Sequence, residues 1–100
     1  MPTEYGPDDE VDHDGPDPVW LQVAAILTAR IERGDYPPRR AIPSESRLMA
    51  EFGIARGTAR KSVAFLVERG YLRTVAGRGS FVLERPRRST DATASDKGDS

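Results

Sequence analysis

The stretch from Ile54 to Gly70 constrains the fold most, because its spacing is typical of one amphipathic helix. At roughly 100° per residue, apolar positions fall on one side of such a helix and basic positions on a neighbouring side. The side expected to pack inward contains Ala59, Val63, Leu66 and Gly70. The exposed side is expected to contain Arg56, Gly57, Arg60, Lys61 and Ala64. A helix with one apolar side needs other elements to cover it.

The basic side has two arginines near its N-terminal end, surrounded by small residues. Arg56 and Arg60 are four residues apart, so their side chains lie one above the other on a helix. Gly57 and Ala64 leave room for a flat partner to come close. Guanidinium groups match phosphates and guanine edges. Contact with DNA and a merely solvated cationic surface are both compatible with this stretch taken alone.

Charge is divided unequally along the chain. The formal net charge is −1, yet residues 1–18 contain seven carboxylates and no Lys or Arg. Residues 19–88 contain fourteen basic side chains against six acidic ones, and the last twelve residues contain three acidic and one basic. A basic centre between acidic tails suits a polyanion, because neutralising phosphates releases condensed counterions.

The composition argues against several classes of protein. No apolar stretch approaches the roughly 18 residues of a membrane span, and the acidic first residues lack the pattern of a signal peptide. We therefore expect a cytoplasmic protein without a membrane segment. The chain has no cysteine, and His13 stands without ligand partners at useful spacing, so we expect no metal or other cofactor. Without a catalytic constellation or a phosphate cradle, we do not expect an enzyme.

The two ends differ in composition from the middle. Residues 1–16 are rich in Pro, Gly and carboxylates and nearly lack apolar side chains, so we expect an acidic disordered arm. This arm is either a solubilising tail or a segment that folds back on the basic surface and competes with DNA. Residues 85–100 are expected to be a polar disordered tail, which leaves residues 17–84 as the folded domain.

Two further helices are predicted before the basic one. Asp17 and Pro18 form a start signal, a capping carboxylate followed by a residue that suits the first turn, and Gly34 a stop signal. Ser44 is expected to cap a short second helix that ends at Gly53. Their buried sides are expected to contain Trp20, Val23, Ala24, Leu27, Ile31, Leu48, Met49 and Phe52. Two helices joined by a short turn are the arrangement with which many proteins contact DNA.

After Gly70 the spacing changes to short β-like runs. Residues 71–75 and 80–83 are predicted to form a β-hairpin around the turn at residues 76–79. Two glycines in the turn allow a close approach to DNA, with Arg78 as the reaching side chain. The expected fold class is therefore mainly α with a small β-hairpin.

Four motifs lie in order along this region. They are Pro-Ser-Glu at 43–45, Arg-Gly-Thr-Ala-Arg at 56–60, Glu-Arg-Gly-Tyr-Leu at 68–72 and Gly-Arg-Gly-Ser-Phe-Val at 77–82. With three helices and a hairpin wing, they closely resemble the DNA-binding domain of GntR-type winged helix-turn-helix regulators, over about Pro18 to Leu83. The resemblance implies a transcriptional regulator that binds double-stranded DNA in a sequence-specific way.

The resemblance also implies residue roles. Arg56 and Arg60 make base or phosphate contacts in the major groove, Glu45 and Thr58 support them at the backbone, and Gly77 approaches the minor groove. The residues expected to contact DNA are Glu45, Arg47, Arg56, Gly57, Thr58, Arg60, Lys61, Gly77 and Arg78. Binding as a homodimer to a two-part site is plausible, because one winged helix covers few base pairs.

The chain departs from the family pattern at several positions. Ser46 stands where the family often has arginine, with Arg47 one place later, and Ala55 replaces the usual Ser or Thr before the basic helix. Phe65 and Val67 occupy commonly charged positions and either complete the core or form a patch for a partner chain. About seventeen residues follow the wing, so we expect no effector-binding domain and no small-molecule effector site in this chain.

A competing interpretation is a winged-helix module that binds a partner protein in a regulatory complex. The exposed arginines argue against it, because an apolar docking surface would not need them. The DNA-binding interpretation requires that Arg56 and Arg60 project freely, without engagement by neighbouring carboxylates. It also requires the loop at Gly77 to lie on the same side of the molecule.

Overall fold

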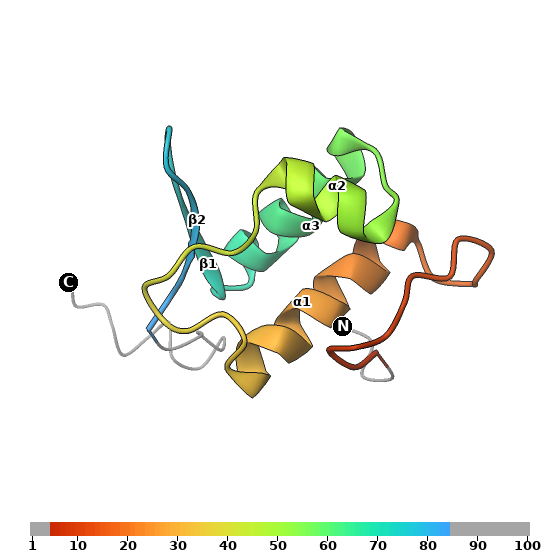
Figure 1. The fold of residues 1–100 in the computed structure, drawn as a ribbon, viewed down its shortest axis with the longest axis horizontal. Coiled ribbons are helices and arrows are strands. Elements are labelled where there is room, and N and C mark those ends of the chain that lie inside the picture. Colours follow the sequence, from red (N-terminus) through yellow and green to blue (C-terminus); the bar gives the residue numbers. More distant parts are fainter. Residues whose placement is uncertain (1–4, 85–100) are drawn as a thin grey trace.

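The computed structural model describes residues 5–84, which form three helices followed by one hairpin (Figure 1). The elements are α1 (Val19–Arg33), α2 (Glu45–Phe52), α3 (Arg56–Glu68), β1 (Leu72–Val75) and β2 (Gly79–Val82). The fold class predicted from the sequence is confirmed. In Figure 1 the hairpin stands at one end of the molecule and the segment before α1 lies at the other. The polar tail expected at residues 85–100 lies outside the described residues.

One apolar core joins the three helices to the base of the hairpin. Its buried members are Val23, Ala24, Ile26, Leu27, Ile31, Ile42, Leu48, Phe52, Ala59, Leu66, Leu72 and Val82. Burying a side chain such as Leu66 contributes about 1.5–3 kcal/mol to stability. Of the residues predicted to pack inward, Trp20, Met49, Val63 and Gly70 are only half-buried, so they lie towards the edge of the core.

Helix α1 ends as predicted but begins differently. Gly34 adopts a left-handed φ of 96°, which closes the helix. The N-cap is Pro18, and no side chain caps the helix, so the prediction of a capping Asp17 is wrong. The carboxylate of Asp17 instead accepts a hydrogen bond from the Tyr5 hydroxyl at 2.9 Å. Asp17 therefore binds Tyr5 of the preceding segment and does not cap the helix.

The junction between α2 and α3 depends on one cap and one glycine. The Ser44 hydroxyl accepts a hydrogen bond from the Arg47 amide at 3.3 Å, so the predicted cap is confirmed. Gly53 ends α2 with a left-handed φ of 64°. Ala55, the N-cap of α3, provides no side-chain cap. Helix α3 is two residues shorter at each end than the helix predicted over 54–70.

A segment outside the hairpin pairs with β2, which the sequence did not predict. Strands β1 and β2 are antiparallel, with Thr74 opposite Ser80 in register. The loop after α1 runs along the other side of β2, where Ala41 forms a bridge with Phe81. Next to it, the Ile42 amide donates to the Ser80 carbonyl at 2.9 Å. The hairpin is thus attached to the helices through the segment that leads into α2.

Residues 5–16 pack against α1, whereas the sequence led us to expect a disordered arm over residues 1–16. The fully buried Gln22 side chain makes three hydrogen bonds, two with Asp12 of this segment and one with the adjoining Asp17. Its amide oxygen accepts from the Asp12 amide at 2.8 Å, and its nitrogen donates to the carbonyls of Asp12 and Asp17. Tyr5 and Val11 pack against the core. Residues 1–4 lie outside the described part of the chain.

Candidate nucleic-acid interface

A groove of about 620 Å³ separates the hairpin from the starts of α2 and α3. It brings together four of the residues singled out from the sequence, Glu45, Arg56, Gly77 and Arg78. The predicted requirement that the hairpin loop lie on the side of the basic helix is therefore met. The hydroxyl residues Thr74 and Ser80 also line this groove, and sequence reasoning did not select them.

Glu45 engages both arginines of α3. Arg56 Nη1 lies 3.1 Å from Glu45 Oε1, and Arg60 Nε lies 3.3 and 3.2 Å from the two carboxylate oxygens. The expectation that no neighbouring carboxylate engages these arginines is therefore wrong. Their side chains nevertheless remain 50% and 67% exposed, so a partner can reach both guanidinium groups.

The local sequence explains why these three side chains meet. Glu45 is the first residue of α2, directly after the Ser44 cap, where a carboxylate is favoured by the helix dipole. Gly53 ends α2 in a left-handed conformation, and α3 begins three residues later. Arg56 and Arg60 are one turn apart on α3 and therefore face the same carboxylate.

The surface beside the two arginines is open. A Cβ atom placed on Gly57 would meet no other atom within 4 Å, so a partner can approach the helix backbone there. Thr58 lies on the opposite side, half-buried, and its carbonyl accepts a hydrogen bond from the Ser62 hydroxyl. Ser62 is fully buried and also donates to the Trp20 carbonyl at 2.8 Å. Its role was not predicted, because a small hydroxyl residue on an apolar side gives little signal.

Lys61 and Arg47 lie away from the groove. The Lys61 ammonium is 4.7 Å from the centroid of the Trp20 ring, which directs it towards α1. Trp20 and Phe65 form an edge-to-face pair with centroids 5.3 Å apart, so Phe65 extends the apolar contact between α1 and α3. Arg47 is exposed on α2 and forms no ion pair with any residue in the described part of the chain.

The hairpin turn presents backbone and one cation. Gly77 has a φ of 76°, which favours glycine, and space around it is open. Arg78 is exposed and has no ion-pair partner among residues 5–84. On the outer surface of the hairpin, Arg78 borders a second hollow with Arg39 and Arg73. These two arginines were not predicted as site residues.

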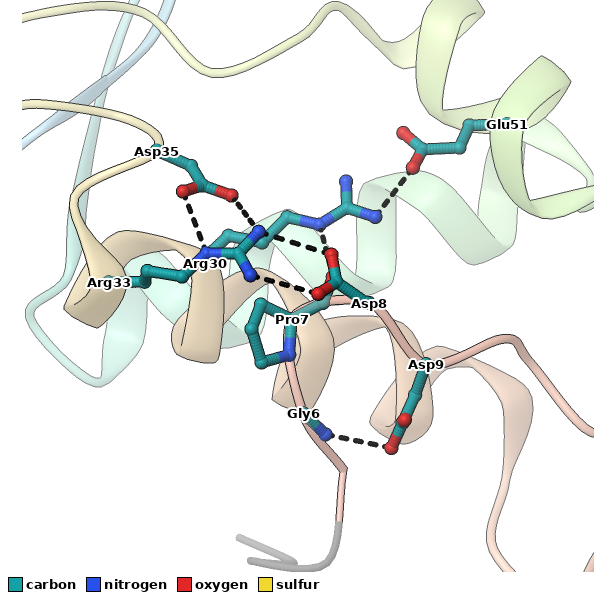
Figure 2. Close-up of polar contacts among 8 residues, drawn as sticks. All are labelled: Gly6, Pro7, Asp8, Asp9, Arg30, Arg33, Asp35 and Glu51. Atoms are coloured by element: carbon teal, nitrogen blue, oxygen red, sulfur yellow. Dashed lines mark hydrogen bonds and ion pairs between the residues drawn. The ribbon is translucent and has the colours of Figure 1, made fainter.

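A second arginine cluster lies on α1, at the other end of α2 (Figure 2). Arg30 donates to Glu51 at 2.6 Å, to the Pro7 carbonyl and to the Tyr36 hydroxyl. The hydrogen bond with Glu51 raises the pKa of the Arg30 guanidinium above its ordinary value. The Arg30 side chain is only 14% exposed, so it is unavailable to a polyanion.

The neighbouring Arg33 connects the N-terminal segment to the end of α1. It bonds to the carboxylates of both Asp8 and Asp35. Hydrogen bonding to Arg33 lowers the pKa of each of these carboxyl groups. The Asp8 contact places the acidic segment on α1, away from the groove that Arg56 and Gly77 line.

Within residues 5–84, no group of three or more His, Cys, Asp or Glu residues is placed to hold a metal ion. No helix of the same region has the length and apolar character needed to cross a membrane.

Comparison with known proteins identifies the family. Residues 20–82 match the model of the gntR family of bacterial regulatory proteins. The mannosyl-D-glycerate transport/metabolism system repressor MngR of Escherichia coli is 39% identical over 70 residues, which are 70% of this chain and 29% of MngR. The transcriptional repressor NagR of Bacillus subtilis is 35% identical over 72 residues, 72% of this chain and 30% of NagR. The chain thus spans less than a third of the length of these relatives.

A solved structure agrees in fold. The AraR DNA-binding domain in complex with operator ORX1 is 34% identical, with a TM-score of 0.66. The alignment covers 74% of this chain and 98% of that one. The chain belongs to the gntR family of bacterial regulatory proteins, and its three helices and hairpin are the winged helix-turn-helix, DNA-binding domain of a transcriptional regulator.

Proposed function

We propose that this domain binds double-stranded DNA at a specific sequence, with the start of α3 in the major groove and the hairpin turn at the minor groove. The observation that carries the proposal is the groove itself, in which Arg56 and Gly77 come from elements on opposite sides. The AraR domain, which is similar in fold and was solved with operator DNA, supports DNA as the partner of this domain.

Arg56 and Arg60 are assigned the base contacts. Each guanidinium group can donate two parallel hydrogen bonds to the O6 and N7 atoms of guanine. The open surface at Gly57 lets the helix approach the base edges closely. Phosphate contacts are assigned to Arg47 and Arg78, and also to Lys61, which lies towards α1. Such contacts set the orientation of the protein without selecting sequence.

The ion pairs with Glu45 do not prevent this function. Pairs between exposed side chains contribute about 0–1 kcal/mol each. A bidentate contact between arginine and guanine provides about 1–3 kcal/mol of discrimination against a wrong base. Exchange of Glu45 for guanine is therefore favourable at the correct sequence, and Arg60, the more exposed of the two arginines, needs the least rearrangement.

We further propose that the chain acts as a homodimer on a two-part DNA site, in the cytoplasm and without catalytic activity of its own. One recognition helix covers few base pairs, and two copies give a longer site whose symmetry matches that of the dimer. That no small-molecule effector site lies within this chain stays a prediction from the sequence.

The test is selection of bound DNA from a random pool, performed with the wild type and with Arg60→Ala at two salt concentrations. The wild type should enrich one sequence family. Arg60→Ala should lose about 1–3 kcal/mol of discrimination, which is roughly 5- to 150-fold, at the contacted base pair. Glu68→Ala, an exposed change at the far end of α3, is the matched control and should keep the wild-type preference.

The outcomes separate base contact from phosphate contact. A uniform loss of affinity with a smaller salt dependence would assign Arg60 to a phosphate. Failure of the wild type to enrich any sequence would contradict sequence-specific binding and favour the protein-interaction module.

A further inference from the structure

Within residues 5–84, Glu45 is the only carboxylate paired with both of the arginines assigned to base contacts. It accepts hydrogen bonds from Arg56 at 3.1 Å and from Arg60 at 3.3 and 3.2 Å. Neither arginine has another ion-pair partner among residues 5–84. One carboxylate is therefore paired with both arginines when no DNA is bound.

The position of Glu45 is itself constrained. The residue begins α2, where the Ser44 cap fixes the backbone, and its side chain is 34% exposed. It also lines the groove between the helices and the hairpin, as does Arg56. A carboxylate held there will face any DNA that enters the groove.

DNA changes the surroundings of this carboxylate. When Arg56 and Arg60 turn to guanine or phosphate, Glu45 loses its partners beside the phosphate backbone, where like charges repel. A carboxylate can be satisfied in the major groove by an amino group, and cytosine N4 is the donor that glutamate most typically contacts. A sequence that offers such a donor next to the guanine contacts gives the carboxylate a new partner, whereas any other sequence leaves it unpaired beside the phosphates.

We propose that Glu45 is a specificity-determining residue, which opposes the binding of DNA of the wrong sequence and favours a site with a cytosine amino group beside the contacted guanines. This inference rests on the proposed function. Glu45 would discriminate in two ways. It would be repelled by DNA of the wrong sequence, and it would accept a hydrogen bond from DNA of the correct sequence.

The experiment compares Glu45→Gln with the wild type on two probes. One is a short duplex enriched by the wild type from a random pool, and the other is a duplex of the same length and random sequence. Glu68→Gln is the matched control, because it removes one exposed negative charge from α3 outside the groove. Thermal unfolding of each variant establishes that it is folded.

Glu45→Gln should bind the random duplex on the order of tenfold more tightly, because two exposed ion pairs and one repulsion are removed. Its affinity for the enriched duplex should change little or fall, so the ratio of the two affinities decreases. Repeated selection with Glu45→Gln should relax the preference at the cytosine position. The control should leave the ratio unchanged.

The proposal requires that Glu45→Gln increases affinity for the random duplex by releasing the two arginines. In an Arg60→Ala background, Glu45→Gln should therefore increase affinity for the random duplex by a smaller factor than in the wild type. An unchanged factor would show that Glu45 acts only through its charge on the phosphates, and this would overturn the proposed mechanism.

Other results also overturn the inference. If Glu45→Gln weakens binding to both duplexes equally, Glu45 only positions the arginines. If the affinity ratio and the selected sequence stay as in the wild type, Glu45 does not determine specificity, although the proposed function stands. Failure of the wild type to enrich any DNA would contradict the proposed function itself.

Discussion

Each end of α2 has one glutamate that forms ion pairs with arginines of a neighbouring helix, but the arginines differ in how exposed they are. At the end of α2, Glu51 pairs with Arg30 of α1, whose guanidinium also bonds to Pro7 and Tyr36 and leaves the side chain 14% exposed. At the start of α2, Glu45 pairs with Arg56 and Arg60, which stay at least half exposed. The first pair is part of the fold, whereas the second leaves its arginines accessible to a ligand.

The number of partners and the exposed fraction explain this difference. Arg30 also lies 5.3 Å from the centroid of the Phe52 ring, so removing it would leave several groups without a partner. Arg60 has only Glu45 among the described residues, and solvent can replace that contact at little cost. The same type of ion pair therefore fixes a largely buried arginine at one end of α2 and leaves two accessible arginines at the other.

The comparison predicts that Arg30→Ala and Arg60→Ala affect stability very differently. Arg30→Ala should lower the free energy of unfolding by about 2–3 kcal/mol, because hydrogen bonds to a largely buried charge are lost. Arg60→Ala should change it by less than about 0.5 kcal/mol, as surface substitutions usually do. Denaturation in urea measures both. Equal losses would contradict the difference between the two ends of α2.

The segment before α1 should contribute to the free energy of unfolding through its hydrogen bonds with Gln22. Gln22→Ala should lower the free energy of unfolding by about 1–2 kcal/mol, because it removes three buried hydrogen bonds and leaves groups of Asp12 unpaired. Chemical denaturation measures this loss. Deletion of residues 2–15 is the test of the cause, because Gln22→Ala should then have a much smaller effect. An unchanged effect would show that Gln22 stabilises α1 independently of this segment.

The pairing of Arg33 predicts a small dependence of stability on pH. Its hydrogen bonds lower the pKa of Asp8 and Asp35 below the ordinary 3.8, so both carboxylates bind protons less readily in the folded protein. Their contribution should be complete above pH 3.8 and should be lost as the pH falls through the lower folded values. Unfolding at several pH values, with Asp8→Asn for comparison, measures it. A difference between the two proteins that grows as the pH falls would contradict the assignment.

Local signals in the sequence were sufficient for most of the fold. The Ser44 cap and the stops at Gly34 and Gly53 depend on a few neighbouring residues, and each was predicted. The apolar spacing of α3 correctly predicted that Ala59 and Leu66 are buried. Such features follow from helix geometry and residue chemistry, which act over one or two turns.

Contacts between residues far apart in the sequence could not be predicted from such local signals. The pairs of Glu45 with Arg56 and Arg60 span 11 and 15 residues, and that of Asp8 with Arg33 spans 25. Composition alone led us to expect disorder before α1, because the buried amide of Gln22 gives no local sign of its partners. The sequence predicted that the hairpin turn lies on the side of the basic helix, whereas the ion pairs beside the groove depend on the packed geometry.

The most direct test of the account is NMR observation of the arginine side-chain Nε–H signals as a DNA duplex enriched from a random pool is added. We predict large shifts for Arg56 and Arg60, which exchange Glu45 for DNA, and none for Arg30 and Arg33, which stay bonded within the fold. Shifts confined to Arg30 and Arg33, or signals of Arg56 and Arg60 that stay unchanged in the complex, would contradict it.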